Sequence, residues 1–361
     1  MTTLVIKSVA CSLCILNTLS SVSPNVLKSP TPNSLRHVMK AVLINEFGDP
    51  SVLHVEEIPI PKPSKDQVLI QVKASGINPV DTFLRQKAFG HIPPLPFIIG
   101  KEAAGVVVEV ASDVGSFKVG DRVVCCLPFD GGYAEYLTCN SSNLIPLSER
   151  LTFSQGAAIY VAYFTAYRSL ITKGSIKAGE LALIHGGSGA VGIASIQLAK
   201  SKGLKVVATA GTQEGLEIVK QAGADVVVNH RETNHLQKAL SEAGSKGFDI
   251  ILENKACANL EEDLRSLREG GRIAVVGCEG TAEINPRWLL AHESQVFGIK
   301  MSAVTENDFK ECTACLVKGM RDGWVRPIIA KEYKLEEAKQ AHEDIMHRHG
   351  ARGKLVFVMD Q

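Results

Sequence analysis

A strand, a glycine-rich turn and a helix follow one another in a single stretch, and this unit limits the possible folds more than any other part of the chain. The apolar run at residues 181–184 predicts a buried strand. Gly187, Gly189 and Gly192 follow at the spacing G-x-G-x-x-G, ahead of apolar residues at helical spacing. In such a unit the first glycine permits a tight turn, the second lets the backbone approach a pyrophosphate, and the third lets helix and strand pack closely. The N–H groups that open the helix then face the phosphates, so the stretch predicts a dinucleotide site.

The residues after this unit repeat the alternation of strand and helix. Apolar runs at 205–210, 225–228, 248–252 and 272–277 are typical of buried strands, and helical patterns separate them. Strands that alternate with helices pair in parallel through right-handed crossovers. One glycine pattern in a chain with 31 glycines is weak evidence and is also compatible with a loop of no special use. The alternation favours a Rossmann domain, which is an α/β fold with a doubly wound parallel sheet.

Residues 1–38 differ in composition from the rest of the chain. They contain no Asp or Glu, are rich in Ser, and carry Lys7, Lys28 and Arg36. The missing acids fit a mitochondrial presequence, and Lys7 before an apolar stretch fits a secretory signal. The stretch also fits a plain N-terminal extension, which we favour, because Met39 can itself begin a complete domain. We therefore predict a cytoplasmic protein, with a mitochondrial location as the alternative.

Charge and cysteine content narrow the function classes. The formal net charge of +1 provides no global field that attracts nucleic acid or an acidic membrane. Nine cysteines in 361 residues are too few for a disulfide framework and indicate the reduced thiols of an intracellular protein.

The residues between the extension and the glycine unit favour a β domain. Short apolar runs at 40–45, 68–72, 105–110 and 120–124 are separated by turn residues. Strands at this spacing predict an all-β, barrel-like domain.

A series of motifs in fixed order resembles one known family. They are GINPVD (76–81), GDRV (120–123), GGYAEY (131–136), QGAA (155–158), YFTAYRSL (163–170), HGGSGAVG (185–192), NHRE (229–232), GGRIAVVG (270–277) and GARGKLVF (350–357). The chain from residue 39 to residue 361 is similar to the zeta-crystallin type of quinone oxidoreductase in the medium-chain dehydrogenase/reductase superfamily. The resemblance implies a GroES-like catalytic domain with an inserted Rossmann domain, NADPH as the reductant, a quinone as the acceptor, and a homotetramer.

The same resemblance implies the domain boundaries. They are an N-terminal extension at 1–38, a GroES-like catalytic domain at 39–164, a Rossmann domain at 165–308, and a C-terminal segment at 309–361 that returns to the catalytic domain.

The residues at the expected zinc positions predict a protein without metal. Zinc-dependent relatives place a Cys and a Gly-His-Glu around the metal, whereas this chain has Ser75 for the Cys and Lys101 for the His. Cys125 and Cys126 are neighbours in a strand, so their side chains point to opposite faces. Cys312 and Cys315 lie one helical turn apart and are best explained as a helix face packed on the core.

Without a metal, the chemistry depends on alignment and on exclusion of water. A quinone accepts hydride or electron equivalents readily, because its reduced oxygen is a stabilised phenolate. No catalytic residue is identified, but candidates for the substrate pocket are Asn78, Asp81, Phe83, Lys101 and Tyr163. Each has a purely structural alternative, and Phe83 replaces a Tyr of the relatives. The ammonium of Lys101 is placed to stabilise negative charge on a quinone oxygen, unless it turns outward or pairs with Glu102 or Asp81.

The end of the second predicted strand favours NADPH over NADH. NAD sites carry an Asp or Glu there for the ribose hydroxyls, but residues 210–212 are uncharged, and Glu214 lies one turn into the next helix. Arg231 and Lys220 are possible partners of a 2′-phosphate. The glycine motif and the resemblance together imply these cofactor contacts: Phe83, Gly187, Ser188, Gly189, Ala190, Val191, Gly192, Gly211, His230, Asn259, Val276, Gly277, Cys278, Glu279, Ile299, Lys300 and Met301.

Two other functions remain open on the sequence. One is an NADPH-dependent enone or alkenal reductase of the same superfamily. The other is a cofactor-binding protein with little turnover, such as a lens crystallin or an RNA-binding protein. The family suggests RNA binding, but the sequence shows no basic run and no patch of interleaved aromatic residues.

Overall fold

A computed structural model describes residues 37–88, 93–127, 131–347 and 352–360. Nearly all of the predicted extension at 1–38 lies outside these residues, so its role stays a prediction. Val38–Gln361 form one compact unit. In the part of the chain that the structure describes, no helix has the length and apolar character needed to cross a membrane.

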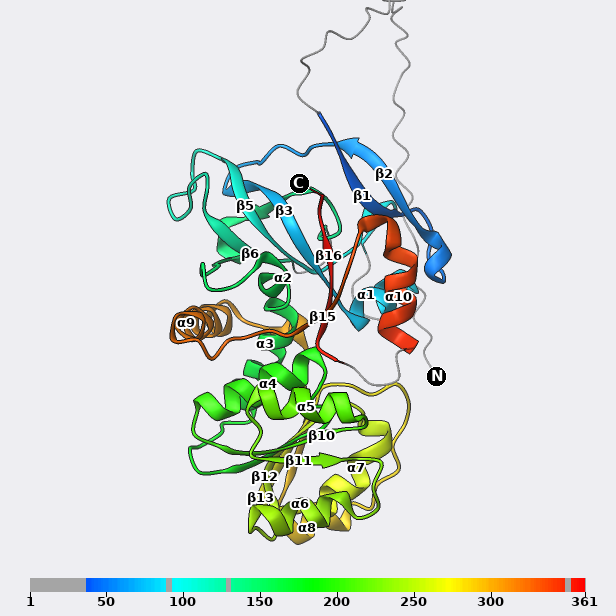
Figure 1. The fold of residues 1–361 in the computed structure, drawn as a ribbon, viewed down its shortest axis with the longest axis vertical. Helices are drawn as coiled ribbons and strands as arrows, with labels where there is room; N and C mark the ends of the chain where they lie inside the picture. The colour runs from blue at the N-terminus through cyan, green and yellow to red at the C-terminus, as the bar shows by residue number, and fades with distance from the viewer. Residues whose placement is uncertain (1–36, 89–92, 128–130, 348–351, 361) are drawn as a thin grey trace, which may run out of the picture. The chain divides into compact units, whose positions relative to one another are not determined.

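The second half of the compact unit is built on a parallel sheet of six strands (Figure 1). Its order is β11-β10-β9-β12-β13-β14, and every neighbouring pair is parallel. The order reverses between β9 and β12, which is where open α/β sheets bind ligands. The Rossmann prediction is confirmed, with boundaries that move by a few residues. The strands are β9 (Leu181–Ile184), β10 (Lys205–Ala210), β11 (Val226–Asn229), β12 (Phe248–Glu253), β13 (Leu267–Val275) and β14 (Gln295–Gly298).

Helices cover both faces of this sheet because its strands are apolar on both sides. Ile184 of β9 belongs to the same hydrophobic cluster as Ile196 of α4, whereas its neighbour Leu183 belongs to a cluster with Leu236 of α6. Successive residues of a strand point to opposite faces, which explains the continuous apolar runs in the sequence. The helices are α4 (Ala190–Ser201), α5 (Gln213–Ala222), α6 (His235–Ala243), α7 (Ala256–Arg265) and α8 (Arg287–His292).

The other part of the compact unit contains a mixed sheet of seven strands and a smaller sheet of three. The large sheet has the order β15-β16-β3-β5-β6-β8, with β7 paired to β3, and the small one has the order β2-β1-β4. This arrangement confirms the expected GroES-like β domain. The strands are β1 (Val38–Ile44), β2 (Leu53–Pro59), β3 (Gln67–Ile77), β4 (Phe97–Ile98), β5 (Glu102–Val110), β6 (Arg122–Cys126), β7 (Tyr136–Asn140), β8 (Leu144–Pro146), β15 (Ile329–Tyr333) and β16 (Lys354–Val358).

The end of the chain belongs to the sheet of seven strands. β16 pairs antiparallel with β3 on one side and parallel with β15 on the other, so the red strand of Figure 1 lies beside a blue one. Gly353 forms a bridge to Gly189, just ahead of α4. The C-terminal strands therefore connect the catalytic sheet to the glycine turn.

The cysteines that were considered as metal ligands occupy the core. Cys125 and Cys126 lie in two different hydrophobic clusters, which confirms that they face opposite sides of β6. Cys312 is buried against the core and Cys315 packs on the same cluster, as expected for one helix face. The remaining helices are α1 (Pro79–Arg85), α2 (Phe153–Gly156), α3 (Tyr160–Tyr167), α9 (Glu306–Asp322) and α10 (Ala338–His347).

Candidate active site

The glycine turn between β9 and α4 has the close packing that the motif requires. Gly186, one residue before the motif, takes the left-handed conformation with a φ of 60°, so the tight turn depends on Gly186 rather than on Gly187. A Cβ on Gly187 would lie 3.0 Å from Cγ2 of Val219. A Cβ on Gly192 would lie 2.4 Å from the carbonyl oxygen of Gly186, too close for any other residue type.

The N-terminus of α4 is free to receive an anion. Gly189 is the N-cap residue and forms no side-chain cap. The N–H groups of the first helical turn therefore have no capping side chain and carry the positive end of the helix dipole. Gly353 donates its N–H to the carbonyl oxygen of Ser188 at 2.7 Å, which fixes the turn from the catalytic side.

The predicted cofactor residues other than Phe83, which lies on α1, follow strand ends at one edge of the parallel sheet. The carboxyl ends of parallel strands meet at the same edge, and each predicted group follows one of these ends. The groups are 187–192 after β9, Gly211 after β10, His230 after β11, Asn259 in the helix after β12, 276–279 after β13, and 299–301 after β14.

Basic side chains surround the end of β10. A Cβ on Gly211 would lie 2.5 Å from Nε2 of His230 and 3.1 Å from Nε of Arg231, so both side chains lie against this glycine. Burial and the neighbouring cations hold the pKa of His230 below its usual value. Glu214, the acid nearest to the strand end in the sequence, forms an ion pair of 2.8 Å with Arg352. Lys220 lies in the last turn of α5, at the opposite end of the helix from this site.

A buried acidic cluster lies where the strand order reverses. His185 follows β9, Glu253 ends β12, and Asp263 belongs to α7; we call these three residues the switch-point cluster. The Nε2 atom of His185 lies 2.8 Å from Asp263 Oδ1 and 3.6 Å from Glu253 Oε2. Burial opposes the charged imidazole, but the two carboxylates raise the pKa of His185 to about 9. Asn259 donates its amide to both oxygens of Glu253, which ties a predicted cofactor residue to the cluster.

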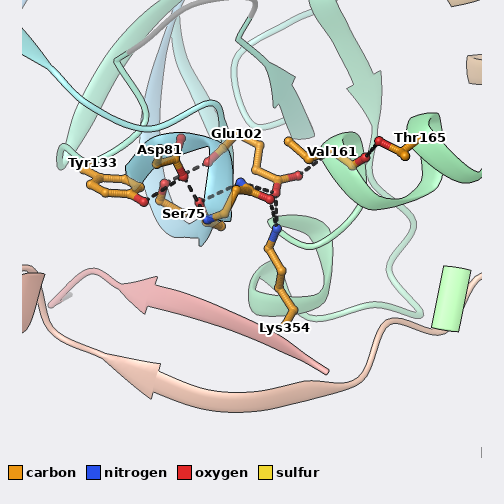
Figure 2. A network of polar contacts seen from close by, with 9 residues as sticks. Ser75, Asp81, Glu102, Tyr133, Val161, Thr165 and Lys354 are labelled. Carbon is orange, nitrogen blue, oxygen red and sulfur yellow. Dashed lines mark hydrogen bonds and ion pairs between the residues drawn. The ribbon is translucent and has the colours of Figure 1, made fainter. Parts of the chain in front are cut away.

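A second buried network lies in the catalytic domain (Figure 2). The carboxylate of Glu102 accepts hydrogen bonds from the ammonium of Lys354, the amide of Asn78 and the backbone N–H of Val161. Lys354 also donates to Oδ1 of Asn78. We call Asn78, Glu102 and Lys354 the catalytic-domain network. Its charges balance, because one ammonium faces one carboxylate in the interior.

Asp81 extends this network toward Tyr133. One carboxylate oxygen of Asp81 accepts hydrogen bonds from the backbone N–H of Asn78 at 2.8 Å and from the hydroxyl of Tyr133 at 2.9 Å. Burial raises the pKa of Asp81 to about 6, against the opposing charges of Lys354 and Lys101. Lys101 is half-buried and acts electrostatically on Asp81, while the carboxylate of Glu102 is bonded to Lys354.

A narrow crevice lies between the catalytic domain and the first turn of α4. Its lining residues are Ala158, Tyr163, Ala190, Ile193, Pro327, Ile328 and Lys354. Tyr163 is buried and donates its hydroxyl to Gln197 at 2.6 Å, so this hydroxyl is engaged within the protein. Phe83 is half-buried on α1. Sequence reasoning missed Lys354, although a lysine that opens the apolar strand KLVFV is itself an unusual signal.

The residues at the expected zinc positions do not suit zinc. Ser75 donates its hydroxyl to the carbonyl oxygen of Glu102 at 2.8 Å, and Glu102 uses its carboxylate on Lys354. The ammonium of Lys101 has no lone pair for a metal. The switch-point cluster brings three ligand-type side chains together, but His185 already bridges the two carboxylates.

Comparisons with known proteins agree with both halves of the fold. Residues 64–149 match the family model described as "Alcohol dehydrogenase GroES-like domain", and residues 190–318 match "Zinc-binding dehydrogenase". The chain is 46% identical to the quinone oxidoreductase of Homo sapiens over 323 residues, which cover 89% of this chain and 98% of that protein. It is 26% identical to the Escherichia coli quinone oxidoreductase solved with NADPH, with a TM-score of 0.77 over 89% of this chain and 100% of that one. An NAD-dependent alcohol dehydrogenase is 27% identical with a TM-score of 0.82, again over 89% and 100% of the two chains.

Proposed function

The chain belongs to the zeta-crystallin-like quinone oxidoreductases of the medium-chain dehydrogenase/reductase superfamily, and we propose that it reduces quinones with NADPH and without a metal. One observation carries the metal-free part of this proposal. The carboxylate that a zinc site would use, Glu102, is instead bonded to a buried ammonium, that of Lys354. A balanced internal ion pair replaces metal coordination at this place.

The surroundings of β10 support NADPH as the cofactor. The strand ends without a carboxylate, and His230 and Arg231 lie against Gly211. Arg352 reaches the same end of α5 through Glu214. Cationic and imidazole N–H groups hydrogen-bond a phosphate strongly, whereas they offer nothing comparable to a ribose hydroxyl.

The protein's share of the reaction is binding, alignment and exclusion of water. Bound NADPH supplies the hydride or electron equivalents that the quinone accepts. The open N-terminus of α4 binds the pyrophosphate, and the side chains along the crevice keep the reacting groups dry. The catalytic-domain network holds the amide of Asn78 in one orientation, because both its oxygen and its NH₂ group are bonded. Lys101 is the candidate for stabilising charge on the quinone oxygen.

A spectrophotometric assay tests the proposed reaction. NADPH oxidation is followed with 9,10-phenanthrenequinone, with NADH in place of NADPH and an enone in place of the quinone as matched comparisons. We expect fast turnover with NADPH and the quinone, unaffected by a chelator, and no stoichiometric zinc in elemental analysis. Activity lost on chelation together with bound zinc would refute the metal-free site, and a faster enone reaction would reassign the substrate class.

The finer organisation is also proposed from the resemblance. We assign the domains 1–38, 39–164, 165–308 and 309–361, and a homotetramer in the cytoplasm. Pairing of β16 with β3 supports the return of the C-terminal segment to the catalytic domain. Sedimentation of the purified protein measures the oligomeric state directly.

A further inference from the structure

Two free thiols lie beside the cofactor edge of the parallel sheet. Cys257 is in the first turn of α7, after β12, and Cys278 is in the loop after β13. Cys278 is exposed and Cys257 is half-buried. Cys278 belongs to the stretch 276–279 that we assign to the cofactor, and Cys257 lies two residues before Asn259, which is also assigned to it.

The backbone brings these two cysteines together. β12 and β13 pair in parallel up to Glu253 and Val275, and the pairing continues beyond the strands. The N–H of Val276 donates to the carbonyl oxygen of Glu253 at 2.8 Å, and the N–H of Ala256 donates to that of Gly277 at 2.9 Å. Cys257 follows Ala256 and Cys278 follows Gly277, so each cysteine is next to one residue of this hydrogen-bonded pair.

Both cysteines lie next to Gly280. Cys278 directs its Sγ at the carbonyl oxygen of Gly280, 3.1 Å away. A Cβ on Gly280 would lie 3.8 Å from the Cβ of Cys257. Both cysteines thus border Gly280.

The other described cysteines do not offer such a pair. Cys125, Cys126 and Cys139 are buried in the catalytic domain, where burial raises the pKa of each thiol and keeps it protonated. Burial does the same for Cys312 and Cys315, which lie on one face of α9. Oxidation of the folded protein should therefore begin at Cys278.

We propose that Cys257 and Cys278 form a redox-active pair whose oxidation to a disulfide weakens NADPH binding. With hydrogen peroxide as the oxidant, the Cys278 thiolate attacks one peroxide oxygen, the O–O bond breaks, and the released hydroxide takes a proton to become water. Cys257 then attacks the resulting sulfenic sulfur, the S–S bond forms, and a second water leaves. The two thiols lose two electrons and two protons, one peroxide becomes two waters, and a dithiol reductant reverses the change.

The disulfide acts on cofactor binding through the two loops that it joins. These loops carry Asn259 and residues 276–279, and a covalent bond between them restricts the movement of these residues relative to one another. The effect on affinity rests on the cofactor placement proposed above, whereas formation of the disulfide does not. By linkage, saturating NADPH should shift the dithiol–disulfide equilibrium toward the dithiol by the same factor by which the disulfide weakens binding.

The experiment oxidises the full-length protein with diamide, a two-electron thiol oxidant that becomes a hydrazine. Peptide mass spectrometry identifies the cross-link, and fluorescence titration gives the Kd for NADPH before oxidation, after it, and after dithiothreitol. We expect a Cys257–Cys278 disulfide, a Kd at least about tenfold higher, equivalent to about 1.4 kcal/mol, and full reversal by dithiothreitol.

Matched variants separate this pair from general thiol damage. Cys257→Ser should show no cross-link and the same Kd before and after diamide, whereas Cys315→Ser should behave as the unmodified protein does. Absence of the Cys257–Cys278 bond, or its formation with an unchanged Kd, overturns the proposal. Failure of the reduced protein to bind NADPH refutes the cofactor assignment instead, and the disulfide mapping is independent of that result.

Discussion

The switch-point cluster and the catalytic-domain network are both buried and polar, but they balance charge differently. The first places two carboxylates around a single imidazole, and burial raises the pKa of Glu253 to about 7. The second places one carboxylate opposite one ammonium, with the amide of Asn78 between them. The stability that the switch-point cluster contributes should therefore depend on pH, because the pKa of His185 is raised to about 9. In the catalytic-domain network the two opposite charges are matched one to one.

Removing the cation of the switch-point cluster should have the largest effect. His185→Leu leaves Glu253 and Asp263 buried without a counter-charge, which should lower the free energy of unfolding by about 3–5 kcal/mol at pH 7. Because the folded pKa of His185 is raised to about 9, its stabilising contribution is complete below its ordinary pKa and is lost as pH rises through 9.

Urea denaturation at several pH values measures this contribution. The variant should fall furthest below the unmodified protein at pH values below the ordinary pKa of histidine, and the difference should shrink above pH 9. An equal loss of stability at both pH values would show that the imidazole contributes packing and not charge.

Breaking the catalytic-domain network should cost somewhat less, because Glu102 keeps two other donors. Lys354→Met should lower the free energy of unfolding by about 3 kcal/mol. Lys354→Met combined with Glu102→Gln removes both charges and should regain more than half of the loss. A double variant no more stable than the single one would mean that Lys354 acts by packing.

Exposed cations of the parallel-sheet domain should affect binding rather than stability. Arg231→Met should raise the Kd for NADPH about tenfold, equivalent to about 1.4 kcal/mol, because one charge-assisted hydrogen bond to the 2′-phosphate is lost. The Kd for NADH should not change. Lys220→Met, at the far end of α5, is the matched control and should leave both constants unaltered. An equal rise in the Kd for NADPH and in the Kd for NADH would contradict a contact between Arg231 and the 2′-phosphate.

A comparable effect, on the rate rather than on binding, is expected at the half-buried cation of the catalytic domain. Lys101→Met should lower kcat with the best quinone at least about tenfold, or about 1.4 kcal/mol, without changing the Kd for NADPH. Lys101→Arg keeps the charge and should restore part of the rate. An unaltered kcat in Lys101→Met would mean that this side of the site contributes to the rate only by aligning the substrate.

The parallel-sheet domain could be predicted from the sequence because its signals are local. Apolar runs and intervening helical patterns fix the strands, and residues such as Ile184 and Leu183 are apolar because both faces of the sheet are covered. The same locality placed the predicted cofactor residues at one edge. The choice between Gly186 and Gly187 for the left-handed turn was not predictable, since adjacent glycines share the same conformational freedom.

The catalytic-domain network could not be found in the same way. Asn78 and Lys354 are 276 residues apart, and no local pattern relates them. The ion pair of Glu214 with Arg352 was missed for the same reason, since Arg352 belongs to the returning end of the chain. A motif such as GARGKLVF identifies a family, but the partner of its lysine depends on tertiary packing.

The position of β16 has a consequence for biosynthesis. A ribosome makes this strand after all the others, yet it belongs inside the catalytic sheet, between β15 and β3. Before β16 is synthesised, the edge of β3 at Ala74–Ile77 has no partner strand on that side, although the strands of the parallel sheet have already emerged from the ribosome. Open strand edges attract other nascent chains, so this interval is when aggregation and chaperone binding compete with folding. A chain interrupted just before Gly353 would carry a finished parallel sheet whose glycine turn never receives its last contact.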